Sequence, residues 1–165
     1  ISKVHGPGEL RTAIEEALRH DPRLIVEAGV QDAREVEVGV MATPHPEVSV
    51  PGEIIVRTGH EFYDFEAKYL DDSVDLVIDP ELPSPVVDGI RHVAQEAFRV
   101  AMCEGLARVD FFVSDAGIVI NEVNTMPGVT SISMFSPMWQ ESGLTYPELI
   151  DHLIAVALDR GIGMR

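Results

Sequence analysis

The segment Gly105–Ser133 reads GLARVDFFVSDAGIVINEVNTMPGVTSIS and carries the most informative pattern of the chain. Its first part alternates apolar residues at odd positions with Arg108, Asp110 and Phe112 at even ones, which is the period of a half-buried strand. A second apolar run follows after a short polar stretch that contains glycine. We therefore predict a β-hairpin that leads into a glycine-containing loop.

The connection between the two strands decides which residues face each other. Residues 115–117, Asp-Ala-Gly, fit a three-residue loop whose glycine adopts the left-handed conformation. Such a loop sets Asp110 opposite Glu122, and it sets Arg108 opposite Asn124. Directly opposed residues share a face of the sheet, with Cβ atoms about 5 Å apart, so all four side chains are expected on one face. A two-residue loop would shift each partner by one residue and divide the group.

The chemistry of these four side chains suits a site that binds a metal cation and a negatively charged ligand side by side. Asp110, Glu122 and Asn124 offer the hard oxygen ligands that Mg²⁺ prefers, with water and phosphate oxygens completing its shell. Arg108 beside them suits a developing negative charge. The chain has one cysteine, Cys103, and six scattered histidines, so no soft-metal pattern competes. The alternative is that the two acids only cover a solvated sheet face; four suitable residues in register favour a magnesium–nucleotide site.

The composition excludes several classes of partner. With 12 basic and 28 acidic residues the formal net charge is −16, which argues against nucleic acid and against an anionic membrane surface. The apolar runs are too short to span a bilayer. One cysteine fits a reducing cytosol, and we expect a cytoplasmic protein. Because only two lysines are present, we expect a C-terminal portion whose cationic half lies upstream; the alternative is a complete acidic domain.

Hydrophobic periodicity and turn residues predict the remaining elements. Helices are expected at 7–20, after a cap at Ser84 with Pro85 in the first turn, and from a capping box at 145–148 to about Gly161. Strands are expected at 24–27, 35–40, 52–56 and 76–78, and residues 58–73 are expected to form an ordered loop. The fold class is therefore α+β, with a mainly antiparallel sheet and flanking helices.

Three motifs in this order resemble one known family. Residues 62–70 (FYDFEAKYL), 105–112 (GLARVDFF) and 121–133 (NEVNTMPGVTSIS) are similar to the C-terminal half of D-alanine–D-alanine ligases of the ATP-grasp superfamily. The resemblance covers 1–165 and implies an ATP-grasp C-terminal domain, with the N-terminal domain and part of the central domain outside this chain.

The resemblance implies an ADP-forming enzyme that joins two D-alanine molecules through an acyl phosphate, for peptidoglycan precursor synthesis. It implies ATP, two Mg²⁺ ions that Mn²⁺ could replace, D-alanine as substrate and a homodimer. Two alternatives stay open: another ATP-grasp carboxylate–amine ligase, and a nucleotide-binding module without turnover.

The family pattern assigns roles near the hairpin. Glu122 would bridge the two metal ions, flanked by Asp110 and Asn124. Arg108 and the backbone N–H of Gly128 would form the oxyanion hole, where a glycine lets the backbone approach a ligand closely.

The same pattern assigns the second substrate. Ser133 together with Lys68 would hold the carboxylate of the second D-alanine. Lys68 and Tyr69 would lie in a loop that closes over the substrates, and this adjacent pair favours an amine acceptor and hence the dipeptide product.

The adenosine site is expected near the first strands. Glu27 would accept a hydrogen bond from the adenine amino group, Glu35 would bind the ribose hydroxyls, and backbone atoms up to Val30 would meet the adenine edge. The chain departs from the family at Ala28, where a lysine or acid often stands, and the segment before Glu35 is one residue longer. Alternatively, Glu35 and Glu37 form the wet face of an alternating strand.

Overall fold

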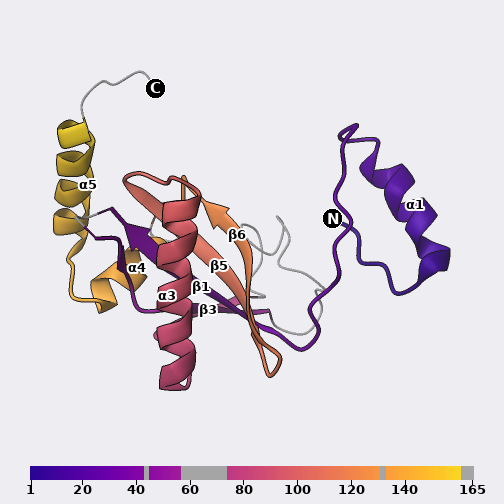
Figure 1. The fold of residues 1–165 in the computed structure, drawn as a ribbon, viewed down its shortest axis with the longest axis horizontal. Helices are drawn as coiled ribbons and strands as arrows, with labels where there is room; N and C mark the ends of the chain where they lie inside the picture. Colours follow the sequence, from indigo (N-terminus) through magenta and orange to yellow (C-terminus); the bar gives the residue numbers. More distant parts are fainter. Residues whose placement is uncertain (43–44, 57–73, 131–132, 161–165) are drawn as a thin grey trace.

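The computed structural model describes residues 1–42, 45–56, 74–130 and 133–160 (Figure 1). The predicted loop at 58–73, with Lys68 and Tyr69, lies outside the described residues. The described elements are, in chain order, α1 (Pro7–Ala17), β1 (Arg34–Met41), β2 (Glu47–Val48), β3 (Gly52–Val56), β4 (Val74–Ile78), α3 (Ser84–Val100), β5 (Leu106–Ser114), β6 (Gly117–Asn124), α4 (Phe135–Glu141) and α5 (Tyr146–Arg160).

The strands form one sheet in the order β4-β3-β1-β5-β6, and β2 pairs with β1 off this path. Every pairing among the described strands is antiparallel. The longest pairing joins β1 to β5 over eight residue pairs, although residues 42–105 separate the two strands in sequence. The prediction of an α+β fold with a mainly antiparallel sheet is confirmed. No helix in the described part of the chain has the length and apolarity needed to cross a membrane.

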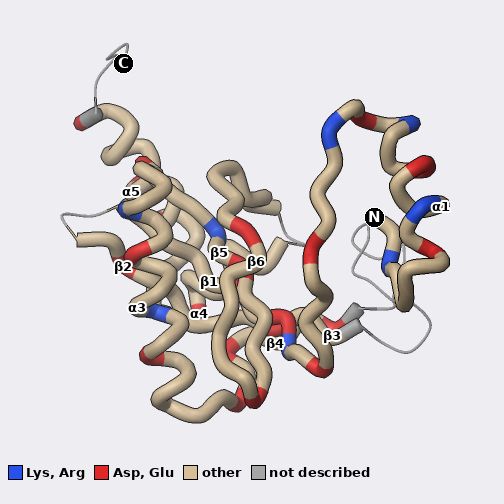
Figure 2. Tube along the Cα trace, turned by 45° about the vertical axis from the view of Figure 1, so that its right-hand side comes forward, with Lys and Arg blue, Asp and Glu red and all other residues tan. Residues whose placement is uncertain are grey.

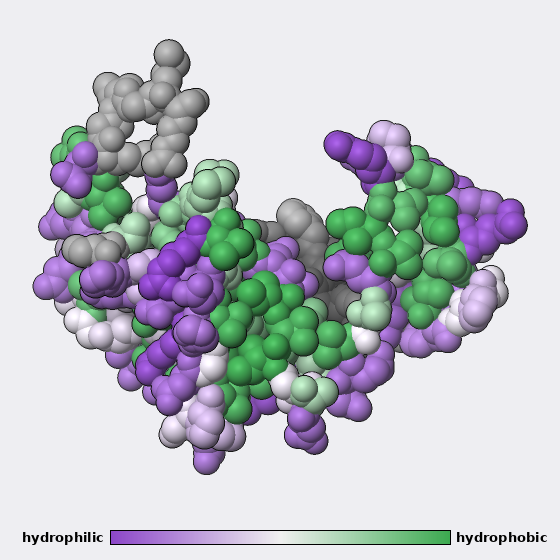
Figure 3. Space-filling view, viewed as in Figure 1, coloured by the Kyte–Doolittle hydropathy of each residue, from purple (hydrophilic) through white to green (hydrophobic). Residues whose placement is uncertain are grey.

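Helix α1 stands apart from the sheet in both ribbon and tube views (Figures 1 and 2). It buries no residue and ends at Ala17, three residues before the predicted end. The predicted strand at 24–27 is wrong, because no described strand pairs with this segment. Ile25 is 82% and Val26 is 65% exposed, and apolar surface is visible at this end of the molecule (Figure 3).

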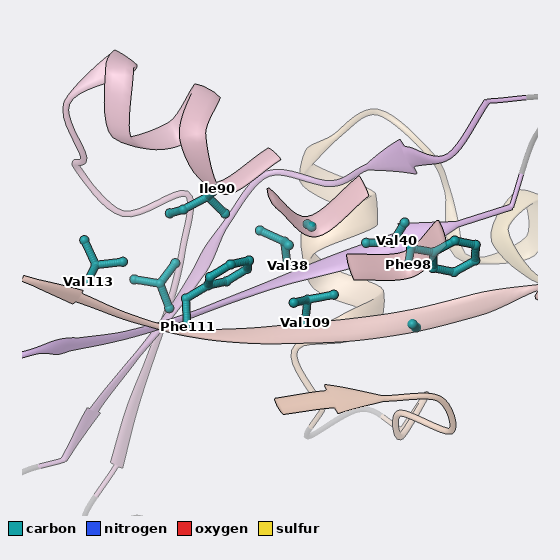
Figure 4. Close-up of a cluster of buried hydrophobic side chains, with 10 residues drawn as sticks. Val38, Val40, Ile90, Phe98, Val109, Phe111 and Val113 are labelled. Atoms are coloured by element: carbon teal, nitrogen blue, oxygen red, sulfur yellow. The ribbon is translucent and has the colours of Figure 1, made fainter. Parts of the chain in front are cut away.

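Helix α3 covers one face of the sheet and encloses the main core. Alternate residues of β1 and β5 belong to this core, and they pack against Ile90 and Phe98 of α3 (Figure 4). The helix begins at Ser84 after Pro83, and no side chain caps it. The predicted Ser84 cap is therefore wrong by one position, whereas Pro85 does lie in the first turn.

Helix α4, which the sequence did not predict, covers part of the opposite face. It fits there because two strand residues lack side chains: a Cβ on Gly39 would lie 2.5 Å from Trp139 Nε1, and a Cβ on Gly52 would overlap Met134. Helix α5 packs behind α4 through Leu149, which is fully buried. Helix α4 therefore covers the second face of the sheet above Gly39 and Gly52. The polar residues Glu37, Arg108 and Asp110 lie next to this covered area on the same face.

Candidate functional site

The β5–β6 hairpin places the four predicted side chains in register. Asp110 pairs with Glu122, and Arg108 pairs with Asn124. The predicted three-residue loop is wrong, because Ser114 pairs with Gly117 and leaves a two-residue connection. The pairing is preserved by a β-bulge: the register shifts between Asp110 and Phe111, so β6 contains one extra residue there.

Arg108 is the centre of this cluster. Its Nε and Nη2 donate to the two carboxylate oxygens of Asp110, each at 2.7 Å. Its Nε also lies 3.1 Å from Glu37 Oε2, and its Nη2 lies 3.9 Å from Glu122 Oε1. One guanidinium is therefore surrounded by three carboxylates from three neighbouring strands, and the group of four carries a formal net charge of −2.

The exposed fraction of the side chains increases across the cluster from Glu37 to Glu122. The side chains of Glu37, Arg108 and Asp110 are 3%, 11% and 16% exposed, whereas that of Glu122 is 60% exposed. Burial alone lowers the pKa of Arg108, but the hydrogen bonds to Asp110 and the charges of all three acids outweigh it and raise the pKa above its ordinary value. Arg108 is a permanent cation in this site.

Glu37 is the site residue that the sequence interpretation missed. The alternation of β1 suggested a wet face for Glu35 and Glu37, but Glu37 is only 2% exposed and contacts Arg108. It lies directly opposite Asp110 because β1 pairs with β5. One consideration could have identified Glu37 from the sequence: an arginine on a half-buried strand needs acidic partners on the neighbouring strands.

The donor set of the cluster suits a hard divalent cation. Asp110, Glu122 and Asn124 present oxygens from one face of the hairpin, and each carboxylate oxygen retains a lone pair beyond its present partners. Asn124 Oδ1 accepts the N–H of Met126 at 3.0 Å, which orients the amide. Within the described ranges, no three acids, histidines or cysteines converge on a metal position by themselves. Oxygens from a bound phosphate would therefore have to complete the shell, as is usual for Mg²⁺.

Gly128, predicted for the oxyanion hole, and Ser133, predicted for the carboxylate site, lie close together. A Cβ on Gly128 would lie 3.5 Å from Ser133 Cβ and 3.9 Å from its Oγ, so the loop after β6 folds back on itself. Ser133 Oγ donates to the carbonyl of Thr130 at 2.8 Å. The Ser133 hydroxyl would have to rotate to donate to a substrate carboxylate.

The predicted adenosine residues are dispersed in the described chain. Glu27 and Val30 are exposed in the segment between α1 and β1. Glu35 is half-buried, and it lies opposite Phe112, on the same face as Asp110. Burial, and then the negative charge of Asp110, raise the pKa of Glu35. Glu35 is therefore adjacent to the cluster, whereas Glu27 is not brought to it by any described contact.

A surface hollow lies away from this cluster. It has a volume of about 610 Å³ and is lined by residues of β2, α3 and α4 and of the segments beside them, among them His45, Arg91, Gln95 and Trp139. Its lining includes none of the predicted site residues, so it is not the site that the hairpin defines.

Known structures with the same arrangement of strands and helices belong to ATP-grasp ligases. The D-alanine-D-alanine ligase from Coxiella burnetii superposes with a TM-score of 0.82 at 37% identity, over 96% of this chain and 41% of that one. The VanG D-Ala:D-Ser ligase from Enterococcus faecalis gives 0.79 at 33% identity, over 92% and 43%. A D-alanine–D-alanine ligase from Bacillus anthracis complexed with ATP gives 0.77 at 27% identity, over 94% and 49%. These likenesses assign the fold to the C-terminal part of ATP-grasp ligases.

Sequence comparison defines the family. The protein-family model described as D-ala D-ala ligase C-terminus matches residues 1–155, and the chain belongs to this family. D-alanine–D-alanine ligases from Streptomyces griseus and Mycobacterium ulcerans are 50% and 49% identical to the whole chain. The chain spans 42% and 46% of the length of these two relatives.

Proposed function

We propose that this chain provides the metal-binding and anion-stabilising part of an ATP-dependent ligase that joins two D-alanine molecules. The observation that carries the proposal is the cluster in which Asp110 and Glu122 each lie within 4 Å of the Arg108 guanidinium. Transfer of a phosphoryl group depends mostly on positioning and on neutralising charge, and this cluster contains residues for both tasks.

Asp110, Glu122 and Asn124 would hold the divalent cations, two Mg²⁺ or Mn²⁺, with Glu122 shared between them. When bound, these ions would neutralise the charge of the phosphate oxygens and orient the transferred phosphoryl group. Glu122 suits the shared position because its side chain is the most exposed of the cluster and lies opposite Asp110.

Arg108 and the N–H of Gly128 would stabilise the oxygen that becomes negative when the amine attacks. In the proposed reaction, the carboxylate of the first D-alanine takes the γ-phosphoryl group of ATP and becomes an acyl phosphate. The amine of the second D-alanine then attacks the carbonyl carbon, and phosphate leaves. Arg108 contributes a fixed positive charge in a largely desolvated position, where such a charge acts strongly.

The remaining contacts are assigned from the family pattern. Ser133 and Lys68 would hold the carboxylate of the second D-alanine, and Tyr69 would lie in the closing loop. Glu35 would bind the ribose, while Glu27 and the backbone at Val30 would bind adenine. We further propose a cytoplasmic homodimer that acts in peptidoglycan precursor synthesis, without nucleic acid or membrane as a partner.

A second acceptor is a specific alternative, because one of the similar structures is a D-Ala:D-Ser ligase at 33% identity. The test is to give the full-length protein ATP and Mg²⁺ with D-alanine alone, with D-alanine and D-serine, or with D-alanine and D-lactate. Phosphate release and product mass are measured in each case. We expect phosphate release and D-alanyl-D-alanine with D-alanine alone.

Each other outcome has a distinct meaning. Release that requires D-serine or D-lactate would show a different ligase. ATP binding without release in the presence of any amino acid would show a nucleotide-binding module and would overturn the proposal.

A further inference from the structure

Glu37 is a buried acid whose position no role assigned above explains. It lies at the centre of β1, opposite Asp110 on β5 and opposite Gly52 on β3. Its side chain is 3% exposed, and its Oε2 lies 3.1 Å from Arg108 Nε. An ionised carboxylate at this depth is costly unless a cation compensates it, and Arg108 provides that cation.

The contact matters because Asp110 has two competing demands in the proposed site. In the described structure both of its carboxylate oxygens accept hydrogen bonds from Arg108. As a metal ligand, the same oxygens would share their electron density with a divalent cation, and the attraction to Arg108 would weaken. Glu122 is a poor substitute anchor, since it lies 3.9 Å away and is 60% exposed.

We infer that Glu37 is the positioning residue of Arg108: it holds the guanidinium at the base of the cluster while Asp110 and Glu122 bind the cations. Glu37 is too buried to reach substrate, so it acts through Arg108 and not on the reacting atoms. This inference rests on the proposed ligase function.

The test is a double-mutant cycle in the full-length protein, with Glu37→Gln and Arg108→Ala alone and combined. Glutamine keeps the shape of Glu37 but removes its charge. In the wild-type background, Glu37→Gln is expected to lower kcat roughly tenfold to a hundredfold, as loss of a residue that orients a ligand does. The KM for D-alanine should change by less than about threefold, because binding of the ground state is not affected.

In the Arg108→Ala background the expected effect on kcat disappears. If Glu37 acts through the guanidinium, Glu37→Gln has nothing left to disturb there, and kcat should stay at the value of Arg108→Ala alone. The single Glu37→Gln variant should also lower the melting temperature. Loss of the kcat effect in the absence of Arg108 is the signature of a residue that acts through Arg108.

A matched control is available on the opposite face of the sheet. Glu53 is 8% exposed and makes a two-point ion pair with Arg34 at 2.7 Å. Glu53→Gln should lower the melting temperature as Glu37→Gln does, but it should leave kcat unchanged. If Glu37→Gln does not fold, Glu37→Asp takes its place in the cycle, with the same pattern and a smaller loss of kcat.

The inference is overturned if Glu37→Gln lowers kcat by the same factor with and without Arg108, or if it lowers stability alone as the control does. These results would leave the ligase function intact. If the wild-type protein releases no phosphate, the proposed function and this inference are overturned together. This outcome is seen in the wild-type assay, before any variant is made.

Discussion

Asp110 lies directly opposite Glu122 because β6 contains one residue more than β5 between this pair and the hairpin connection. The extra residue at the bulge compensates for a loop that is one residue shorter than the sequence suggested. Without it, Glu122 and Asn124 would project from the face that α3 covers. The bulge therefore keeps Asp110, Glu122 and Asn124, the proposed oxygen ligands, on one face with Arg108, and bulges commonly re-aim side chains beside functional sites.

The first prediction concerns Glu122, the proposed shared metal ligand. Glu122→Gln in the full-length protein should nearly abolish phosphate release, because the variant keeps the shape of the side chain and removes the charge placed opposite Asp110. Asp115→Asn, at the exposed hairpin connection, is the matched control and should retain wild-type turnover. Near-normal activity of Glu122→Gln would contradict the metal role.

The second prediction concerns the central cation. Arg108→Ala should lower kcat by on the order of a hundredfold or more, as removal of an oxyanion donor does. Arg108→Lys should restore little, because an ammonium group does not reproduce the two parallel bonds to Asp110. Steady-state kinetics check both variants. A change confined to KM would indicate that Arg108 binds the ground state instead.

The hairpin and the register of its polar side chains were predictable from sequence because the information is local. Alternation of polar and apolar residues identified β5 and β6, and the types of side chain led to the prediction of a hard-cation site. The loop length was predicted incorrectly, because a two-residue turn with a distant bulge gives the same pairing at Asp110 as a longer loop.

Glu37 and α4 were missed because their environment depends on contacts between distant parts of the chain. Alternation in β1 gives no sign of which strand lies beside it, and only the β1–β5 pairing brings Glu37 to Arg108. Helix α4 is short and mixes polar and apolar residues, and it is recognisable only from the space above Gly39 and Gly52. The strand predicted at 24–27 was apolar but has no partner among the described strands.

The third prediction concerns the packing of α4 on the sheet. Gly39→Ala would place a methyl group 2.5 Å from Trp139 Nε1 and 3.0 Å from Phe135 Cε2. We expect a loss of about 1–3 kcal/mol in the free energy of unfolding, which is typical of overpacking. Gly8→Ala in α1 is the control, since nothing lies within 4 Å of the added carbon. Equal stability of the two variants in chemical denaturation would contradict the close packing.

The fourth prediction concerns the start of α5. Glu148 Oε2 accepts the N–H of Thr145 at 2.9 Å and its hydroxyl at 2.5 Å, and these bonds lower the pKa of Glu148 below 4.5. A lowered pKa in the folded state means that the stabilisation is present above about pH 4.5 and is lost as the pH falls through the lowered value. Glu148→Gln should therefore lower the melting temperature at neutral pH.

The difference between wild type and Glu148→Gln should shrink as the pH falls through the lowered pKa of Glu148 and the wild-type carboxylate becomes protonated. Thr145→Ala should remove part of the same stabilisation, because only the hydroxyl contact is lost. Thermal denaturation over a series of pH values checks this. A difference that is constant from neutral to acid pH would exclude the charged contact as its cause.

The most direct test of the cluster as a magnesium–nucleotide site is a crystal structure of the full-length protein with Mn²⁺ and a non-hydrolysable ATP analogue. Anomalous scattering identifies the positions of the manganese ions directly from the diffraction data. We predict peaks at coordination distance, about 2 Å, from oxygens of Asp110, Glu122 and Asn124, with Arg108 beside the terminal phosphate. Manganese and nucleotide bound elsewhere, with Asp110 and Glu122 free of metal, would contradict the account.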